Sequence, residues 1–372
     1  MQVTDIKVYP IKSYRNSGIP SPWILLQVFT DEGLVGVGDA TNWPGGRIIA
    51  RAIEELGSLV IGEDPFHIEY LYHRMYHALH QIGQTGAVIA AISGIEIALW
   101  DIVGKALGRP IYDLLGGPCR DRVRFYSHAD QPQGCVRLAQ KGCTAIKAYF
   151  PGGRPRRGER IEIPTSITLG DEMKALDHMR RCRRAVGDEV DIATDLGARY
   201  TTSAAIRLGK RLEEIGLLFF EEPVGPENID ALAKVRAAIG APVCVGERRY
   251  TRFGFRDLIA AQAVDMIMPD VVRAGGILET KKIAAMAESY YMQVSPHNPN
   301  SAVSTLASLQ LMANIPNGLV LEYVDDEQDA PWRNDLLCHP PQVEDGCLLV
   351  PARPGLGTEL VMKEVEKYRF EG

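Results

Sequence analysis

Six ionisable side chains occur at or near the carboxyl ends of six successive apolar segments: Asp195, Glu221, Glu247, Asp270, His297 and Glu322. Successive members of this series are 26, 26, 23, 27 and 25 residues apart. About 25 residues make up one strand, one helix and two loops of a (β/α) barrel. The carboxyl ends of the strands in such a barrel share one rim, so this spacing predicts that the six groups gather at a single mouth.

Three members of the series, Asp195, Glu221 and Glu247, are carboxylates from adjacent segments. Carboxylates crowded within a few ångström repel one another unless a cation neutralises them. Ligation by oxygen alone with open positions suits Mg²⁺, with Mn²⁺ as a substitute. The pattern therefore predicts a metal site, and the alternative is that each carboxylate pairs with a nearby arginine such as Arg248.

The remaining members suit removal of a proton next to a carboxylate group. His297 comes one segment after Asp270, so the two can form a pair in which the carboxylate fixes the ring tautomer and raises its basicity. A divalent cation stabilises the charge of the resulting enolate. Glu322 would serve best if protonated, donating a hydrogen bond to an enolate oxygen, and Lys147 offers a positive charge to the same oxygens.

The elements that position these residues begin after about one third of the chain. Residues 2–9 and 23–29 read as strands, 31–33 as a turn, and 47–60, 65–80 and 86–107 as helices, which together predict an α+β unit. Short apolar runs then alternate with amphipathic segments, as in a parallel sheet. We expect eight strands with seven helices between them, at 123–126, 145–149, 190–195, 218–221, 243–247, 266–270, 292–297 and 319–322.

Composition narrows the class of protein. The 372 residues carry a net charge of −6 without long runs of one sign, which argues against a nucleic-acid or membrane-surface partner. The first residues have neither a basic start nor an apolar core, and no stretch reaches about 18 consecutive apolar residues. Seven cysteines without a C-x-x-C pair indicate free thiols. We expect a cytoplasmic protein with a small-molecule substrate.

Several motifs resemble the mandelate racemase branch of the enolase superfamily. They are AISGIEIALWDIVGK at 91–105, PIYDLLGG at 110–117, FEEP at 220–223, GER at 246–248, SPHN at 295–298 and LEY at 321–323. The resemblance spans about two thirds of the chain. It implies an α/β architecture, a modified (β/α)₇β TIM barrel (119–325) with an α+β capping domain (1–118, completed by 326–372).

The resemblance also implies roles for particular residues. Mg²⁺ would bind Asp195, Glu221 and Glu247, His297 and Asp270 would form the base, and Glu322 would donate a hydrogen bond to the enolate. Loops of the capping domain would select the substrate, with Arg15 and Trp43 as binding residues. The long segment 151–170 is expected to be a lid whose Arg154 binds a distal anionic group. A homo-oligomer is expected from the resemblance alone.

Departures from the family pattern indicate the reaction. Racemases of this branch carry a K-x-K pair on the second strand, but here Tyr149 follows Lys147 in that pattern, and Gly197 stands where galactonate dehydratase has a histidine. Racemisation needs groups on both faces of the enolate, whereas elimination of water can run with one base. We expect an acid-sugar dehydratase that resembles galactonate dehydratase and gives a 2-keto-3-deoxy acid. An epimerase or cycloisomerase that uses Tyr149, or a regulator that binds a sugar acid without turnover, are the alternatives.

Overall fold

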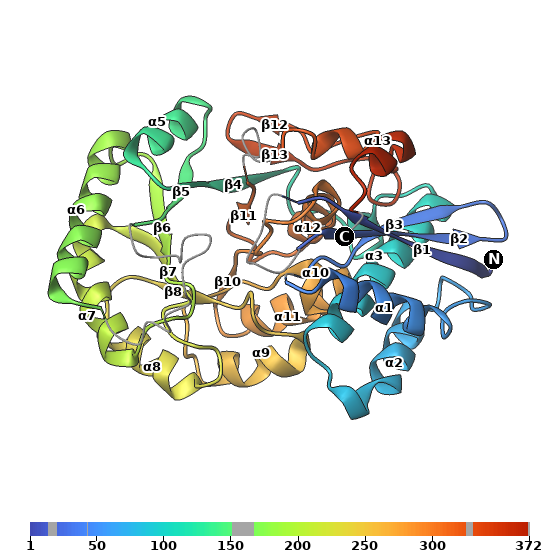
Figure 1. Ribbon diagram of the computed structural model, residues 1–372, viewed down its shortest axis with the longest axis horizontal. Helices are drawn as coiled ribbons and strands as arrows, with labels where there is room; N and C mark the ends of the chain where they lie inside the picture. Colours follow the sequence, from blue (N-terminus) through green and yellow to red (C-terminus); the bar gives the residue numbers. More distant parts are fainter. Residues whose placement is uncertain (14–20, 43, 151–166, 325–329, 371–372) are drawn as a thin grey trace.

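The computed structural model describes residues 1–13, 21–42, 44–150, 167–324 and 330–370. The chain forms a barrel and an α+β capping unit that packs against one side of it (Figure 1). The capping unit starts with an antiparallel meander whose turn places Gly33 at φ 82°, a conformation that favours glycine. Its elements are β1 (Val3–Ile11), β2 (Trp23–Thr30), β3 (Val35–Asp39), α1 (Gly46–Gly57), α2 (Ile68–Ala78), α3 (Ala87–Leu107) and α4 (Ile111–Leu114).

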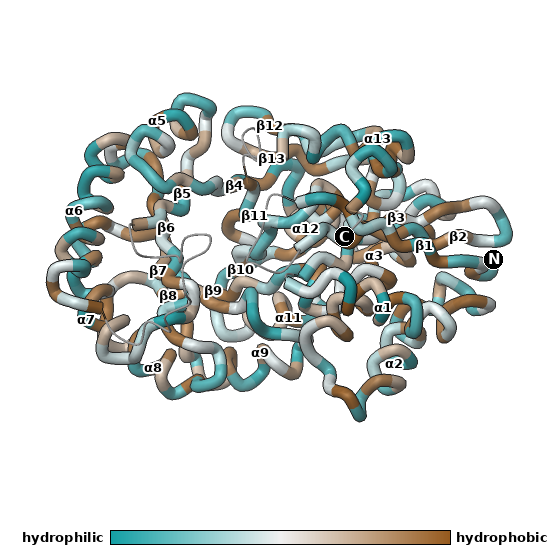
Figure 2. The backbone as a smooth tube through the Cα atoms, viewed as in Figure 1, coloured by the Kyte–Doolittle hydropathy of each residue, from teal (hydrophilic) through white to brown (hydrophobic). Residues whose placement is uncertain are grey.

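Helix α3 is the core of the capping unit. It packs closely on β3, where a Cβ added to Gly36 or Gly38 would lie 2.1 or 2.0 Å from a backbone oxygen of the helix. Among the described residues, α3 is long and apolar enough to cross a membrane, yet 89% of its most apolar window is buried within the protein. Figure 2 shows the apolar colours along α3 and the meander and more polar ones on the outer helices α5 and α6. This burial explains the apolar composition of α3.

The barrel consists of parallel strands in the order β10-β9-β8-β7-β6-β5-β4, with β11 paired to β4. A bridge between Val294 of β10 and Gly318, just before β11, closes the ring. The strands are β4 (Arg122–Ala129), β5 (Ala145–Ala148), β6 (Asp191–Asp195), β7 (Leu217–Glu221), β8 (Val243–Val245), β9 (Met266–Ile267), β10 (Gln293–Val294) and β11 (Leu321–Glu322). The described residues thus form the predicted (β/α)₇β barrel with an α+β cap.

Helices cover the outside of the barrel. Several begin at a side chain that accepts a hydrogen bond from the first turn, as Thr168, Thr201, Asn228 and Ser301 do. The helices between strands are α5 (Pro132–Gln140), α6 (Leu169–Val186), α7 (Thr202–Leu212), α8 (Ile229–Ala238), α9 (Thr251–Ala260), α10 (Val271–Ala274), α11 (Gly276–Glu288) and α12 (Ala302–Asn314).

The chain after β11 returns to both parts of the molecule. It contains β12 (Val343–Glu344), β13 (Cys347–Leu349) and α13 (Met362–Lys367). Strand β13 pairs antiparallel with the start of β4, whereas a bridge joins Arg369 to Ile11 of β1. The red C-terminal segment therefore lies beside the blue N-terminal strands in Figure 1.

The observed strands differ in length from the predicted ones. The later strands are short, with two residues in β9, β10 and β11. Strands β9 and β10 end before Asp270 and His297, whereas Glu322 is the last residue of β11. The first barrel strand is longer than predicted and runs to Ala129 rather than to Tyr126. This extension brings one more ionisable side chain, His128, to the carboxyl end of the sheet.

The barrel interior explains how the mouth is built. Its buried layer consists of Tyr126, Ala145, Ala193, Phe219, Cys244, Met266, Met268 and Val320. Because side chains two residues apart on a strand share a face, the next inward position lies nearer the carboxyl end. Six of these residues are followed two positions later by an ionisable side chain: His128, Lys147, Asp195, Glu221, Asp270 and Glu322.

Candidate active site

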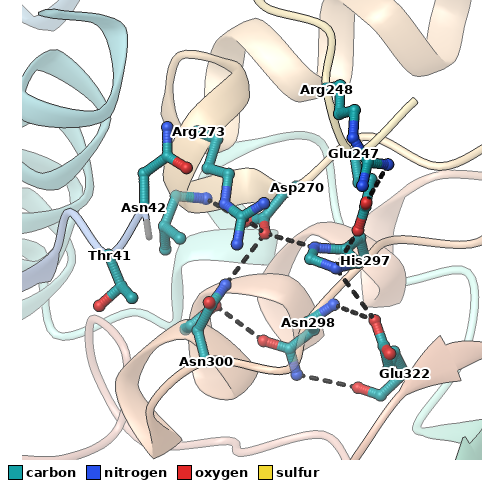
Figure 3. A network of polar contacts seen from close by, with 12 residues as sticks. Thr41, Asn42, Glu247, Arg248, Asp270, Arg273, His297, Asn298, Asn300 and Glu322 are labelled. Carbon is teal, nitrogen blue, oxygen red and sulfur yellow. Dashed lines mark hydrogen bonds and ion pairs between the residues drawn. The ribbon is translucent and has the colours of Figure 1, made fainter. Parts of the chain in front are cut away.

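The predicted base pair is formed at the mouth. His297 Nδ1 lies 2.7 Å from Asp270 Oδ2, and both side chains are almost fully buried (Figure 3). Asp270 follows β9 and its Oδ1 also accepts a hydrogen bond from the Val272 N–H at the start of α10. The carboxylate is therefore fixed by backbone structure, and it fixes the imidazole in turn.

The other nitrogen of the imidazole is bound as well. His297 Nε2 lies 2.5 Å from Glu247 Oε2 and 3.9 Å from Glu322 Oε2. Burial alone would lower the pKa of His297, but the charges of Glu247 and Glu322 and the hydrogen bond to Asp270 outweigh burial and raise it to about 9. These contacts favour the form of the ring that carries a proton on each nitrogen.

Lys147 lies between two glutamates on the opposite part of the rim. Its Nζ is 3.0 Å from both Glu221 Oε2 and Glu322 Oε1, and the side chain is buried. Burial favours the neutral amine, but the two carboxylates outweigh it and raise the pKa of Lys147 well above its ordinary value. Lys147 is thus a buried cation of the mouth.

Glu322 is surrounded by donors. Its Oε2 accepts a hydrogen bond from the Asn298 N–H at 2.8 Å, while Lys147 and His128 contact Oε1. Burial opposes ionisation, but Lys147, His297 and His128 hold the pKa of Glu322 well below its ordinary value. These surroundings favour the carboxylate form, whereas the sequence led us to expect a protonated group.

The three carboxylates of the predicted metal site come from neighbouring elements. Asp195 and Glu221 are paired residues of β6 and β7, and Glu247 follows β8. Burial raises the pKa of Glu221, and repulsion from Asp195, Glu322 and Glu247 adds to this rise against the attraction of Lys147. The negative charge is therefore incompletely compensated, and an oxygen-ligated cation fits this donor set.

The carboxylates are oriented toward protein cations. Glu221 faces Lys147, and Glu247 contacts both His297 and Arg248. Arg248 also pairs with Glu222 at 3.2 Å. Of the three predicted metal ligands, Glu247 thus has the arginine partner that we considered as the alternative to a metal ion. Within the described ranges, no group of three His, Cys, Asp or Glu side chains is arranged to hold a metal ion as it stands.

The other predicted site residues are Tyr149, Arg15, Trp43 and Arg154. Tyr149 is buried just after β5, with its ring 5.5 Å from that of His128 and perpendicular to it. Arg15, Trp43 and Arg154 fall outside the described residues. Their predicted contacts with the substrate therefore stay predictions.

The sequence reading missed three residues that contact this network. Asn300 Nδ2 and Arg273 Nε lie 3.0 and 3.2 Å from Asp270 Oδ2, the oxygen that also binds His297 (Figure 3). His128 contacts Glu322 from β4. The alternation of Tyr126 and His128 on one strand face was the available signal for His128, whereas Arg273 and Asn300 lie beyond the strand ends.

Comparisons with known proteins agree with this architecture. Residues 2–116 match the family model described as the mandelate racemase / muconate lactonizing enzyme N-terminal domain, and 133–364 match the enolase C-terminal domain-like model. The D-xylonate dehydratase of Haloferax volcanii is 39% identical, covering 94% of this chain and 86% of that protein. The D-galactarolactone cycloisomerase of Agrobacterium fabrum is 32% identical over 93% and 91% of the two chains.

A solved structure shows the same fold. The mandelate racemase/muconate lactonizing enzyme-like protein from Rubrobacter xylanophilus superposes with a TM-score of 0.90. It is 33% identical, and the match covers 100% of this chain and 98% of that one. The cap and the barrel are thus shared along the whole described chain.

Proposed function

The chain belongs to the mandelate racemase / muconate lactonizing enzyme family, and from this premise we propose that it is a Mg²⁺-dependent dehydratase of an acid sugar. The substrate class is an aldonate or aldarate, and the product is a 2-keto-3-deoxy acid. The similarity to a D-xylonate dehydratase supports hydro-lyase chemistry. The observation that carries the proposal is the His297–Asp270 pair at a mouth that also holds Lys147 and three neighbouring carboxylates.

The proposed mechanism begins with binding of the substrate carboxylate near Lys147. The buried ammonium group attracts the anion and remains charged because of its two glutamate partners. Asp195, Glu221 and Glu247 would hold the metal ion. A divalent cation bound there supplies an electrophile that stabilises negative charge on the substrate oxygens.

His297 then removes the proton on the carbon next to the carboxylate. Asp270 keeps Nδ1 protonated, so Nε2 is the nitrogen that accepts the proton. Nε2 contacts Glu247 in this structure, and the ring must lose that proton before it can act as a base.

The test is an assay of product formation with purified protein and MgCl₂. D-xylonate, D-galactonate and a panel of five- and six-carbon aldonates and aldarates are incubated, and 2-keto-3-deoxy acids are detected as semicarbazones. We expect turnover of at least one acid, its loss in His297→Asn and its loss after treatment with EDTA. Turnover that survives in His297→Asn under saturating Mg²⁺ would remove this histidine from the mechanism.

A second candidate function is that of an epimerase or cycloisomerase. The similarity to a D-galactarolactone cycloisomerase and the buried Tyr149 at the mouth favour it. Exchange of the substrate α-hydrogen with solvent deuterium, without any loss of water, would support this function. Binding of an acid sugar that requires metal but leads to no reaction would instead support a regulator.

A further inference from the structure

His128 is an ionisable side chain of the barrel mouth to which the mechanism above gives no role. It lies on β4, two residues after Tyr126 of the barrel interior, and contacts Glu322 Oε1 through Nε2. Its side chain is 15% exposed, compared with 3% for His297. His128 is therefore part of the mouth and remains accessible to small molecules.

The two histidines flank Glu322. Strand β11, which carries Glu322, pairs with β4 on one side, and Gly318, just before β11, is bridged to Val294 of β10 on the other. His297, just beyond β10, approaches Oε2 at 3.9 Å, and His128 contacts Oε1. A substrate held at Lys147 and Glu322 would therefore have an imidazole on each flank.

We propose that His128 is a second catalytic residue, the general acid that protonates the departing 3-hydroxyl group. This inference rests on the proposed dehydration. A dehydratase with His297 as its only acid–base group must return the abstracted proton to the leaving group from that same imidazole. With His128 as the acid, abstraction and protonation are carried out by separate groups from two strands.

The proton and electron balance of the step is complete. The C2–H proton goes to His297 Nε2, and the C–H electron pair passes through the enolate to form the C2–C3 double bond. The C3–O bond breaks, and its oxygen takes a proton from His128 Nε2 to leave as water. The enol then moves a proton to C3 as it becomes the 2-keto-3-deoxy acid, and solvent returns a proton from His297 to His128.

Tyr149 is less suited to the same step. A phenol has an ordinary pKa near 10, whereas an imidazole titrates near 6.5, so the imidazolium is the stronger acid at neutral pH. His128 Nε2 also contacts the carboxylate of Glu322, whereas the Tyr149 ring packs against the His128 ring. The perpendicular contact of Tyr149 with the His128 ring suits a role in orienting that ring.

The experiment separates proton exchange from loss of water. Wild type, His128→Gln and His297→Asn are incubated with D-xylonate, D-galactonate and Mg²⁺ in D₂O, and exchange at C2 and release of keto acid are both measured. We expect His128→Gln to release keto acid roughly 10²- to 10⁴-fold more slowly while exchange at C2 is retained. His297→Asn should lose both, and His73→Gln, an exposed histidine on α2, should lose neither.

A second variant covers the case in which His128→Gln does not fold. In His128→Ala, added imidazole should restore release of keto acid without increasing exchange. The acid role is overturned if His128→Gln dehydrates at the wild-type rate, if only its KM rises, or if exchange falls together with elimination. A wild-type protein that releases no keto acid from any acid of the panel above overturns the proposed function itself, whereas normal dehydration in both proteins overturns only the role of His128.

Discussion

Replacing Glu96 by alanine tests the joint between the capping unit and the barrel. Glu96 lies on α3, is 1% exposed, and accepts hydrogen bonds from the N–H groups of Ile277 and Leu278 at 2.8 and 2.9 Å. Both N–H groups lie in the first turn of α11, so a side chain of the capping unit satisfies two donors at the N-terminus of a barrel helix. Trp100 Nε1 donates a third bond at 2.9 Å.

The expected loss of stability follows from the three donors. Alanine leaves all three without this acceptor, at a cost of up to about 1–3 kcal/mol per donor. The Ile277 N–H is buried, and the Leu278 and Trp100 donors are partly buried. The total is smaller than the sum of three such costs for two reasons. Two of the donors belong to one helix N-terminus, where loss of an N-capping side chain costs only about 0.5–2 kcal/mol. Water can also enter the vacated volume. We expect the free energy of unfolding to fall by about 3–5 kcal/mol, a large part of the roughly 5–15 kcal/mol of an ordinary domain.

Glu96 also makes stability depend on pH. Burial raises the pKa of Glu96 to about 8, although the backbone hydrogen bonds of Leu278 and Ile277 oppose this rise. Between the ordinary value of about 4.5 and this raised value, the folded protein binds a proton that the unfolded chain has lost. The contribution of Glu96 therefore falls as pH rises through this window, by at most about 1.4 kcal/mol per pH unit.

Urea unfolding followed by circular dichroism measures both effects. Wild type, Glu96→Ala and Glu96→Gln are compared at several pH values between 5 and 8, and Glu96→Gln should show the weaker pH dependence. Glu54→Ala, which removes an exposed partner of Arg51 on α1, is the matched control and should change stability by less than about 0.5 kcal/mol. A Glu96→Ala protein within about 1 kcal/mol of wild type would refute the reasoning from unsatisfied donors.

Three further substitutions test the joint and the site. Gly276→Ala places a Cβ 2.0 Å from Glu96 Oε2 and should lower the free energy of unfolding in urea by about 3 kcal/mol or more. The control Gly62→Ala has a similar φ but no neighbouring atoms, and it should cost only about 1–2 kcal/mol. Equal losses in the two variants would exclude the clash. Asp270→Asn should slow exchange of the substrate α-proton by about 10²-fold or more because the tautomer of His297 is no longer fixed, and unchanged exchange would contradict the pair. Lys147→Met should lower the free energy of unfolding by about 3–5 kcal/mol because two buried carboxylates lose their cation. Added Mg²⁺ should recover part of this loss, measured as a rise in Tm.

The regular spacing of strand ends made the barrel predictable from the sequence. One structural unit recurs about every 25 residues, so residues such as Glu221 and His297 are assigned to one rim without knowledge of any contact. His128 was not predicted because the expected first barrel strand ends at Tyr126, three residues before the observed end at Ala129. Alternation along that strand would have included it.

Other features of the site depend on contacts that spacing does not encode. Glu96 and Ile277 are 181 positions apart, and the glutamate in the motif at 91–105 shows no sign of its partner. The directions of the Glu247 and Glu221 side chains depend on which cation each meets, since Glu247 turns to His297 and Glu221 to Lys147. Metal binding by Asp195, Glu221 and Glu247 therefore stays a prediction. It is supported by the kind of side chains at the ends of these neighbouring strands and not by their present orientation.

The capping unit is linked to the His297–Asp270 pair through the helices that follow β9 and β10. Glu96 binds the start of α11 after β9, and Asp39 of β3 accepts a 2.5 Å hydrogen bond from Ser301, which caps α12 after β10. Asn300, next to Ser301, donates to Asp270 Oδ2. A substitution in the cap can thus displace Asp270 or His297 without touching the substrate, because the elements that carry them are anchored there. Loss of activity in a cap variant consequently identifies a substrate contact only when KM changes and proton exchange at C2 does not.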